Sequence, residues 1–97
     1  MMILFACMTV DPSRHDEFKK KMAEYLDQTD SSQYKASVYE ILVHATDPSK
    51  VYAYEEWPDA ESLHEWMGSE AHARGVEFFG DMILDTEVRI YEAQPAS

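Results

Sequence analysis

The sequence predicts an α+β protein in which helices cover one face of a four-stranded antiparallel sheet. Apolar alternation typical of strands occurs in four segments, and helical periodicity separates them in the order strand, helix, strand, strand, helix, strand. This order is the split βαβ arrangement, also called ferredoxin-like. With 97 residues we expect one domain over residues 1–97, ending in a tail over about residues 93–97.

The first strand is expected over residues 2–10, where both alternating sets of side chains are largely apolar and predict coverage of both faces. Asp11 before Pro12 predicts a capped helix start, because proline is tolerated in the first turn. A helix follows, because apolar residues recur at i, i+4 and i+7. They are Phe18, Met22 and Tyr25.

Two strands, over residues 36–44 and 51–57, are expected to pair as an antiparallel hairpin. The Asp47-Pro48 pair between them is a turn signal.

Asp59 is expected to cap the second helical region, which Gly68 and Ser69 interrupt. The helix then resumes to about Phe79 and ends at Gly80, and a last strand covers residues 82–92. In the first part of this second helical region, the buried side is expected to carry Leu63, Trp66 and Met67.

A single sheet leaves its second face open. We expect Phe5, Tyr39, Tyr54 and Val88, or their neighbours, to place apolar surface there. Because burying such a surface against a second copy is economical, the sequence predicts a homodimer through this face.

Charge and composition exclude several classes of function. Eight basic against nineteen acidic residues give a net charge of −11, which argues against nucleic acid and anionic membranes as partners. No apolar run approaches the roughly 20 residues that cross a bilayer, and the N-terminus lacks the basic region of a secretory signal. The single cysteine, Cys7, cannot form an intrachain disulfide, so we expect a cytoplasmic protein.

His72 is the candidate for acid–base chemistry, because the pKa of histidine ordinarily lies near neutrality. Arg74 is a candidate for binding an anionic intermediate, although residues two apart point to different sides of a helix. The sequence has no cysteine cluster, no glycine-rich phosphate loop and no paired metal-binding histidines. We therefore expect neither a metal nor a cofactor.

Four aromatic residues are candidates for contacting a flat ligand. Trp57 and Trp66 lie nine positions apart and could wall a pocket, although tryptophans of small domains more often form the core. Tyr39 and Tyr52 lie on the hairpin strands, where their hydroxyls could orient a phenol or simply pack across the strands.

The segment Glu55-Glu56-Trp57-Pro58-Asp59-Ala60-Glu61-Ser62-Leu63 resembles a motif of the antibiotic biosynthesis monooxygenase family of dimeric α/β-barrel proteins. The resemblance extends by element order over nearly the whole chain. It implies the ferredoxin-like fold, a homodimer, and oxidation of a small aromatic by dioxygen without a cofactor, as in quinol and anthrone oxygenases. His72 would then be the base, Trp66 a stacking wall, and Arg74 or a tyrosine the oxyanion partner.

The chain departs from the family at functional positions. Trp66 stands where quinol-oxidising relatives have a histidine, and Ala71 precedes His72 where their next histidine falls. Haem-degrading relatives share a tryptophan at Trp66 but have an asparagine near Ala6 and a haem-ligating histidine near Val76. The hypotheses are therefore a monooxygenase for a quinol, anthrone or related phenol, a non-catalytic or ligand-binding barrel, and, less favoured, a haem-binding or haem-degrading protein.

Overall fold

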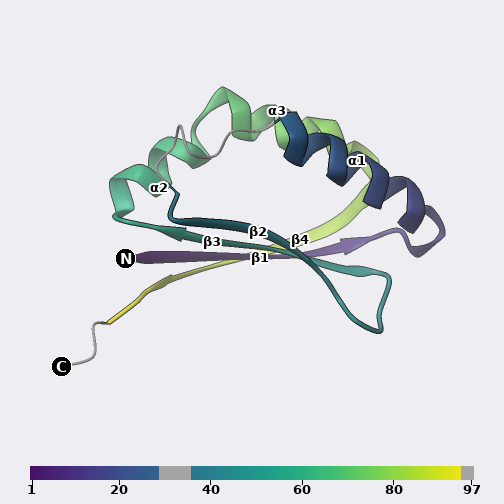
Figure 1. The fold of residues 1–97 in the computed structure, drawn as a ribbon, viewed down its shortest axis with the longest axis horizontal. Helices are drawn as coiled ribbons and strands as arrows, with labels where there is room; N and C mark the ends of the chain where they lie inside the picture. The colour runs from purple at the N-terminus through teal and green to yellow at the C-terminus, as the bar shows by residue number, and fades with distance from the viewer. Residues whose placement is uncertain (29–35, 95–97) are drawn as a thin grey trace.

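The computed structural model describes residues 1–28 and 36–94, so the end of the predicted tail lies outside the described residues. It confirms the predicted order of strands and helices (Figure 1). The elements are β1 (Met2–Val10), η1 (Pro12–Arg14), α1 (His15–Gln28), β2 (Val38–Val43), β3 (Lys50–Trp57), α2 (Ala60–Met67), α3 (Glu70–Phe79), η3 (Gly80–Met82) and β4 (Ile83–Glu92).

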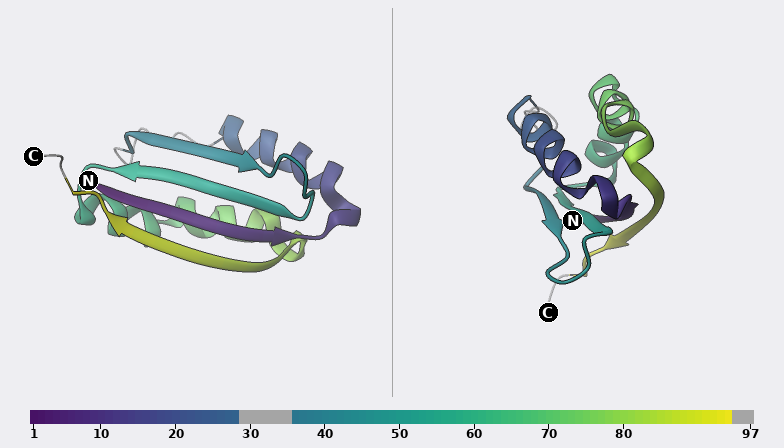
Figure 2. Two further views of the ribbon diagram at one scale, coloured as in Figure 1. Left: turned by 90° about the horizontal axis from the view of Figure 1, so that it is seen from below. Right: turned by 90° about the vertical axis from the view of Figure 1, so that its right-hand side faces the viewer.

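The four strands form one antiparallel sheet in the order β2-β3-β1-β4. The helices lie on one face of this sheet, and the opposite face is uncovered (Figures 1 and 2). This is the expected ferredoxin-like arrangement. Among the described residues, the helices are too short or too polar to cross a membrane.

Local signals in the sequence fix the helix boundaries. The Asp59 carboxylate accepts a hydrogen bond from the backbone N–H of Ser62 at 2.7 Å and begins α2. The Ser69 hydroxyl accepts one from the N–H of His72 at 3.1 Å and begins α3. Gly80 ends α3 with a φ of 52°, a conformation that glycine adopts without steric cost.

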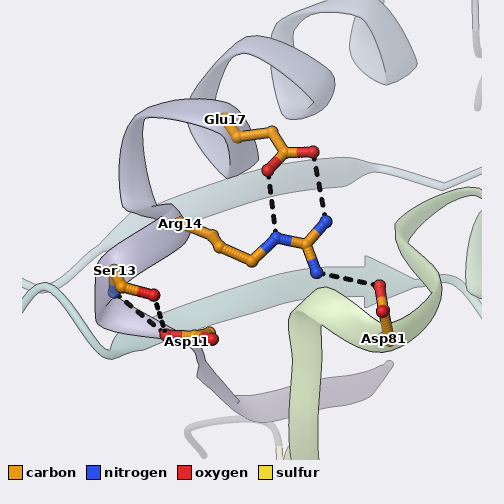
Figure 3. A network of polar contacts seen from close by, with 5 residues as sticks. All are labelled: Asp11, Ser13, Arg14, Glu17 and Asp81. Carbon is orange, nitrogen blue, oxygen red and sulfur yellow. Dashed lines mark hydrogen bonds and ion pairs between the residues drawn. The ribbon is translucent and has the colours of Figure 1, made fainter.

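A network of polar contacts joins the start of α1 to η3 (Figure 3). Asp11 caps η1 by accepting hydrogen bonds from the backbone and the hydroxyl of Ser13. The Arg14 guanidinium donates to both carboxylate oxygens of Glu17, at 3.0 and 3.1 Å, and to Asp81 at 3.0 Å. The network therefore connects two segments that are distant in the sequence, at the end of the sheet where β4 begins.

The strand register shows that two of the four residues expected on the open face of the sheet lie on the other face. Phe5 pairs with Tyr54, and both lie on the uncovered face as predicted. Tyr39 and Val88, however, lie on the face under the helices, where both line a cavity. The physical reason is the two-residue period of a strand: an offset of one position moves a side chain to the other face.

Two apolar clusters hold the helices to the sheet, one toward each end of the central strands. The first contains Leu4, Trp57, Leu63 and Trp66, and the second contains Val10, Phe18, Val51 and Met82. All of these side chains are at most 5% exposed. Because bulky residues gather at the two ends, the space between the clusters depends on the smaller residues in the middle of the strands.

Candidate functional site

A cavity of about 430 Å³ lies between the sheet and the helices. Its sheet wall includes Ala6 and Ala53, which are register partners on β1 and β3. The cavity exists because these two small side chains face the helices between the two bulky clusters. Its volume is within the range of small-molecule sites, and most of its surface is apolar.

Gly75 shapes the helix wall of the cavity. A Cβ atom at this position would lie 2.6 Å from the Tyr25 hydroxyl and 2.9 Å from the Tyr25 ring. The absent side chain therefore allows the Tyr25 ring to pack against α3, where it also contacts Phe79 with ring centroids 5.3 Å apart. Tyr25 in turn lies near enough to Tyr39 to help raise the pKa of the Tyr39 hydroxyl, so α1 and β2 bring two phenol groups to the cavity.

Glu55 is a buried carboxyl group in the sheet wall of the cavity. It is only 4% exposed, and its Oε1 accepts a hydrogen bond from the indole N–H of Trp57 at 3.0 Å. Burial raises the pKa of Glu55 to about 7, although the bond from Trp57 acts in the opposite direction. The same burial, with the neighbouring Tyr25 and Glu55, raises the pKa of the Tyr39 hydroxyl well above its ordinary value.

Glu55 was not among the residues predicted to form the site. Its signal is nevertheless present in the strand pattern, because Val51, Ala53 and Trp57 occupy the same alternate positions of β3 and are all buried. A glutamate in an otherwise apolar register is the kind of exception that marks a functional candidate.

His72 lies in the helix wall of the same cavity. Its backbone is fixed by the Ser69 cap, and its ring meets the Trp66 ring nearly at a right angle with centroids 5.7 Å apart. Partial burial lowers the pKa of His72. Burial therefore favours the neutral imidazole, which is the form able to accept a proton.

The two tryptophans form a layer behind these groups. Trp57 and Trp66 are at most 1% exposed, and their rings stack with centroids 6.0 Å apart. The rings of Trp66 and Tyr39 also meet nearly at a right angle, with centroids 5.9 Å apart. Neither indole is part of the cavity lining, so the tryptophans position Glu55, Tyr39 and His72 and do not themselves form the wall.

Two predicted site residues lie elsewhere. Arg74 has a side chain that is 68% exposed and is 3.8 Å from the carboxylate of Glu70. Tyr52 lies on the uncovered face of the sheet, where it stacks on Phe5 with centroids 5.4 Å apart. Of the six predicted residues, the structure thus brings His72 and Tyr39 to the cavity.

The mouth of the cavity is apolar. Met67, Val76 and Val88 line the cavity yet are 36%, 63% and 48% exposed, which places the opening between α2, α3 and β4. Met67 therefore lies at this opening and not in the core as its helical position predicted. Among the described lining residues there is no lysine or arginine.

The positions linked to haem chemistry carry no suitable side chains. Ala6 and Val76, near which the resemblance predicted the asparagine and histidine of haem-degrading relatives, are both apolar parts of the lining. Within the described ranges, no group of three or more histidine, cysteine or acidic residues is arranged to hold a metal ion.

Comparison with known proteins agrees with this architecture. The family profile "Antibiotic biosynthesis monooxygenase" matches residues 1–77. A solved structure described as an antibiotic biosynthesis monooxygenase is 24% identical, with a TM-score of 0.80 and coverage of 98% of this chain and 100% of that one. A proposed antibiotic biosynthesis monooxygenase from Nitrosomonas europaea is 17% identical, with a TM-score of 0.81 and coverages of 96% and 98%.

A conserved protein from Methanosarcina mazei Go1 is similar at 20% identity, with a TM-score of 0.77 and coverages of 96% and 92%. At these identities the solved structures establish the fold alone. A search of curated proteins gave no significant match. The family profile covers most of the sequence and supports a monooxygenase-like or small-ligand-binding role, and the chain belongs to the antibiotic biosynthesis monooxygenase family.

Proposed function

We propose that the protein is a cofactor-independent monooxygenase that oxidises a small quinol, anthrone or related phenol with dioxygen. The observation that carries this proposal is the apolar cavity of about 430 Å³ with the His72 imidazole in its wall. An apolar cavity with a few convergent polar groups is the usual form of a small-molecule site. The proposal that no cofactor takes part is supported by the resemblance to the quinol and anthrone oxygenases of this family, which act without one.

In this mechanism His72 accepts a proton from the bound aromatic. The neutral imidazole that burial favours is the form able to do so. The resulting anion is electron-rich and passes an electron to dioxygen, and the two radicals then combine. The O–O bond of the resulting peroxide then breaks. One oxygen atom stays in the product, and the other leaves as water with two hydrogens of the substrate, one of them the proton that His72 accepted.

The remaining groups of the cavity support this step. The hydroxyls of Tyr39 and Tyr25 are the groups proposed to stabilise the substrate oxyanion, a role that the outward-facing Arg74 does not fill. The buried Trp66 fixes the ring of His72 from behind. The apolar lining excludes water, which strengthens each of these interactions.

Oxygen uptake with a panel of quinols and anthrones tests the proposal. We expect substrate-dependent uptake by the wild type and a loss of about a hundredfold or more in His72→Ala, because general-base catalysis contributes about 10²–10⁴-fold. His64→Ala is the matched control, since His64 is an exposed histidine of the neighbouring helix α2. Uptake that is unchanged in His72→Ala would remove His72 from the mechanism.

The alternative, a binding protein without catalysis, predicts a different outcome of the same experiment. The panel would then bind, as measured by calorimetry, yet no member would cause oxygen uptake in the wild type. This result would contradict the monooxygenase and would leave the cavity as a ligand-binding site.

We also propose that the protein forms a homodimer through the uncovered sheet face. Phe5, Tyr52 and Tyr54 form an aromatic cluster there, with ring centroids 5.4 and 6.3 Å apart. An aromatic surface of this kind favours burial against a second copy. Sedimentation equilibrium should give the mass of a dimer for the wild type and of a monomer for Phe5→Glu. A monomeric wild type at micromolar concentration would contradict the proposal.

A further inference from the structure

Within the described part of the chain, one carboxyl oxygen of Glu55 has no hydrogen-bond partner. Its Oε1 accepts the indole N–H of Trp57, and the described part of the chain supplies no hydrogen bond to Oε2. The residue is only 4% exposed, so this carboxyl group is largely removed from water. Among the described residues, Oε2 is not one of the fully buried side-chain atoms without a partner, so it keeps accessible surface, and Glu55 lines the cavity. A hydrogen-bond donor inside the cavity can therefore reach Oε2.

We propose that Glu55 binds the hydroxyl group of a neutral aromatic ligand and disfavours ligands that carry negative charge. This inference rests on the proposed function and specifies its ligand class. Glu55 lies in the sheet wall and His72 in the helix wall of one cavity. A ligand with two oxygen functions therefore has a polar contact available on each side of its apolar ring system.

The groups around Glu55 determine which ligand fits. Tyr25 from α1, Tyr39 from β2 and His72 from α3 line the same cavity, and Trp57 of β3 holds Oε1. None of them carries a permanent positive charge. A carboxylate without a cation nearby accepts hydrogen bonds from neutral donors and repels carboxylates and phosphates. Because the pKa of Glu55 is raised to about 7, this acceptor form predominates on the alkaline side of neutrality.

The substitution Glu55→Gln changes the hydrogen-bonding groups and the charge of the side chain and keeps its size and shape. The amide oxygen takes over the hydrogen bond from the Trp57 indole, because that indole is a donor only. The amide NH₂ group then faces the cavity in place of Oε2. The variant therefore replaces an acceptor by a donor and removes the negative charge in one substitution.

Calorimetric titration with three naphthalene derivatives tests the inference. The probes are 1-naphthol, which can donate a hydrogen bond, its methyl ether, which cannot, and 1-naphthoate, which is an anion. The titrations are carried out under nitrogen, which suppresses oxidation, at about pH 8, where Glu55 is ionised. We expect the wild type to bind 1-naphthol at least about tenfold more tightly than the methyl ether, which is the usual effect of a hydrogen bond to a charged group.

Glu55→Gln should bind the naphthol and its ether with similar affinity, and it should gain affinity for 1-naphthoate. Glu65→Gln, which removes an exposed glutamate of α2, is the matched control and should retain the wild-type order. A second measurement uses the wild type alone: its preference for naphthol should weaken as the pH falls below about 7, where the Glu55 carboxylate takes up a proton.

Each outcome decides a different point. Equal binding of naphthol and ether by the wild type would overturn the role of Glu55 and leave the aromatic cavity intact. An unchanged preference in folded Glu55→Gln, judged by circular dichroism, would also overturn it. If that variant does not fold, a wild-type preference independent of pH overturns it. Absence of binding by all three probes would instead refute the aromatic site of the proposed function, and the inference with it.

Discussion

Replacing Glu55 by glutamine should change how the stability of the protein depends on pH. The pKa of this carboxyl group is raised from its ordinary value of 4.5 to about 7 by burial. Between these two values the folded protein binds a proton that the unfolded chain has lost. The stability of the wild type therefore falls as the pH rises from about 4.5 to about 7, and this penalty is fully present at higher pH.

The size of the effect follows from the same pKa values. One unit of pKa corresponds to about 1.4 kcal/mol, so ionisation of Glu55 costs the folded state about 3 kcal/mol at pH 8. Glutamine cannot ionise and carries no such penalty. The free energy of unfolding of Glu55→Gln relative to the wild type should therefore rise by about 3 kcal/mol between about pH 4.5 and pH 8.

Urea unfolding followed by circular dichroism across this range measures the difference directly. The other titrating groups are common to both proteins, so their contributions largely cancel. Glu65→Gln serves again as the control for loss of one negative charge from an acidic protein. A difference between Glu55→Gln and the wild type that stays constant with pH would show that Glu55 is hydrated with an ordinary pKa. That result would refute the interpretation that the Glu55 carboxyl group is shielded from water in the cavity wall.

Two further predictions concern packing and ion pairs, and both are measured by urea unfolding. Gly75→Ala should destabilise the protein, because the cost of about 1–3 kcal/mol for crowding the Tyr25 ring exceeds the helix-propensity gain of about 1 kcal/mol. The same change made in a Tyr25→Ala background should instead stabilise it, and equal effects in both backgrounds would contradict the proposed contact. Arg14→Gln should lower the urea midpoint more than Arg74→Gln, because Arg14 holds two carboxylates from separate segments whereas Arg74 contacts Glu70 within its own helix. This difference should shrink in molar salt, and a salt-independent difference would indicate a cause other than charge.

Much of the fold was predictable because its signals are local. Asp59 and Gly80 lie where a capping carboxylate and a residue of positive φ are required. The alternation of residues 51–57 identified β3 without knowledge of its neighbours. Hydrogen bonds within a few residues determine such features, so the sequence pattern contains what is needed to find them.

The candidate site was only partly predictable. His72 and Tyr39 were identified by residue type and lie in the cavity wall. Arg74 and Tyr52 were chosen on the same grounds but point away from it. Residue type shows what a side chain can do, whereas its direction depends on register and helix phase.

The sequence by itself determined the order of the elements, their caps and the family to which the chain belongs. The tertiary structure alone decided where the cavity lies and what lines it. The pairing of Ala6 with Ala53 opens space between two bulky clusters, and Gly75 allows Tyr25 to reach its wall. Packing also buries Glu55 beside this space and raises its pKa, because desolvation is imposed by residues from several elements at once.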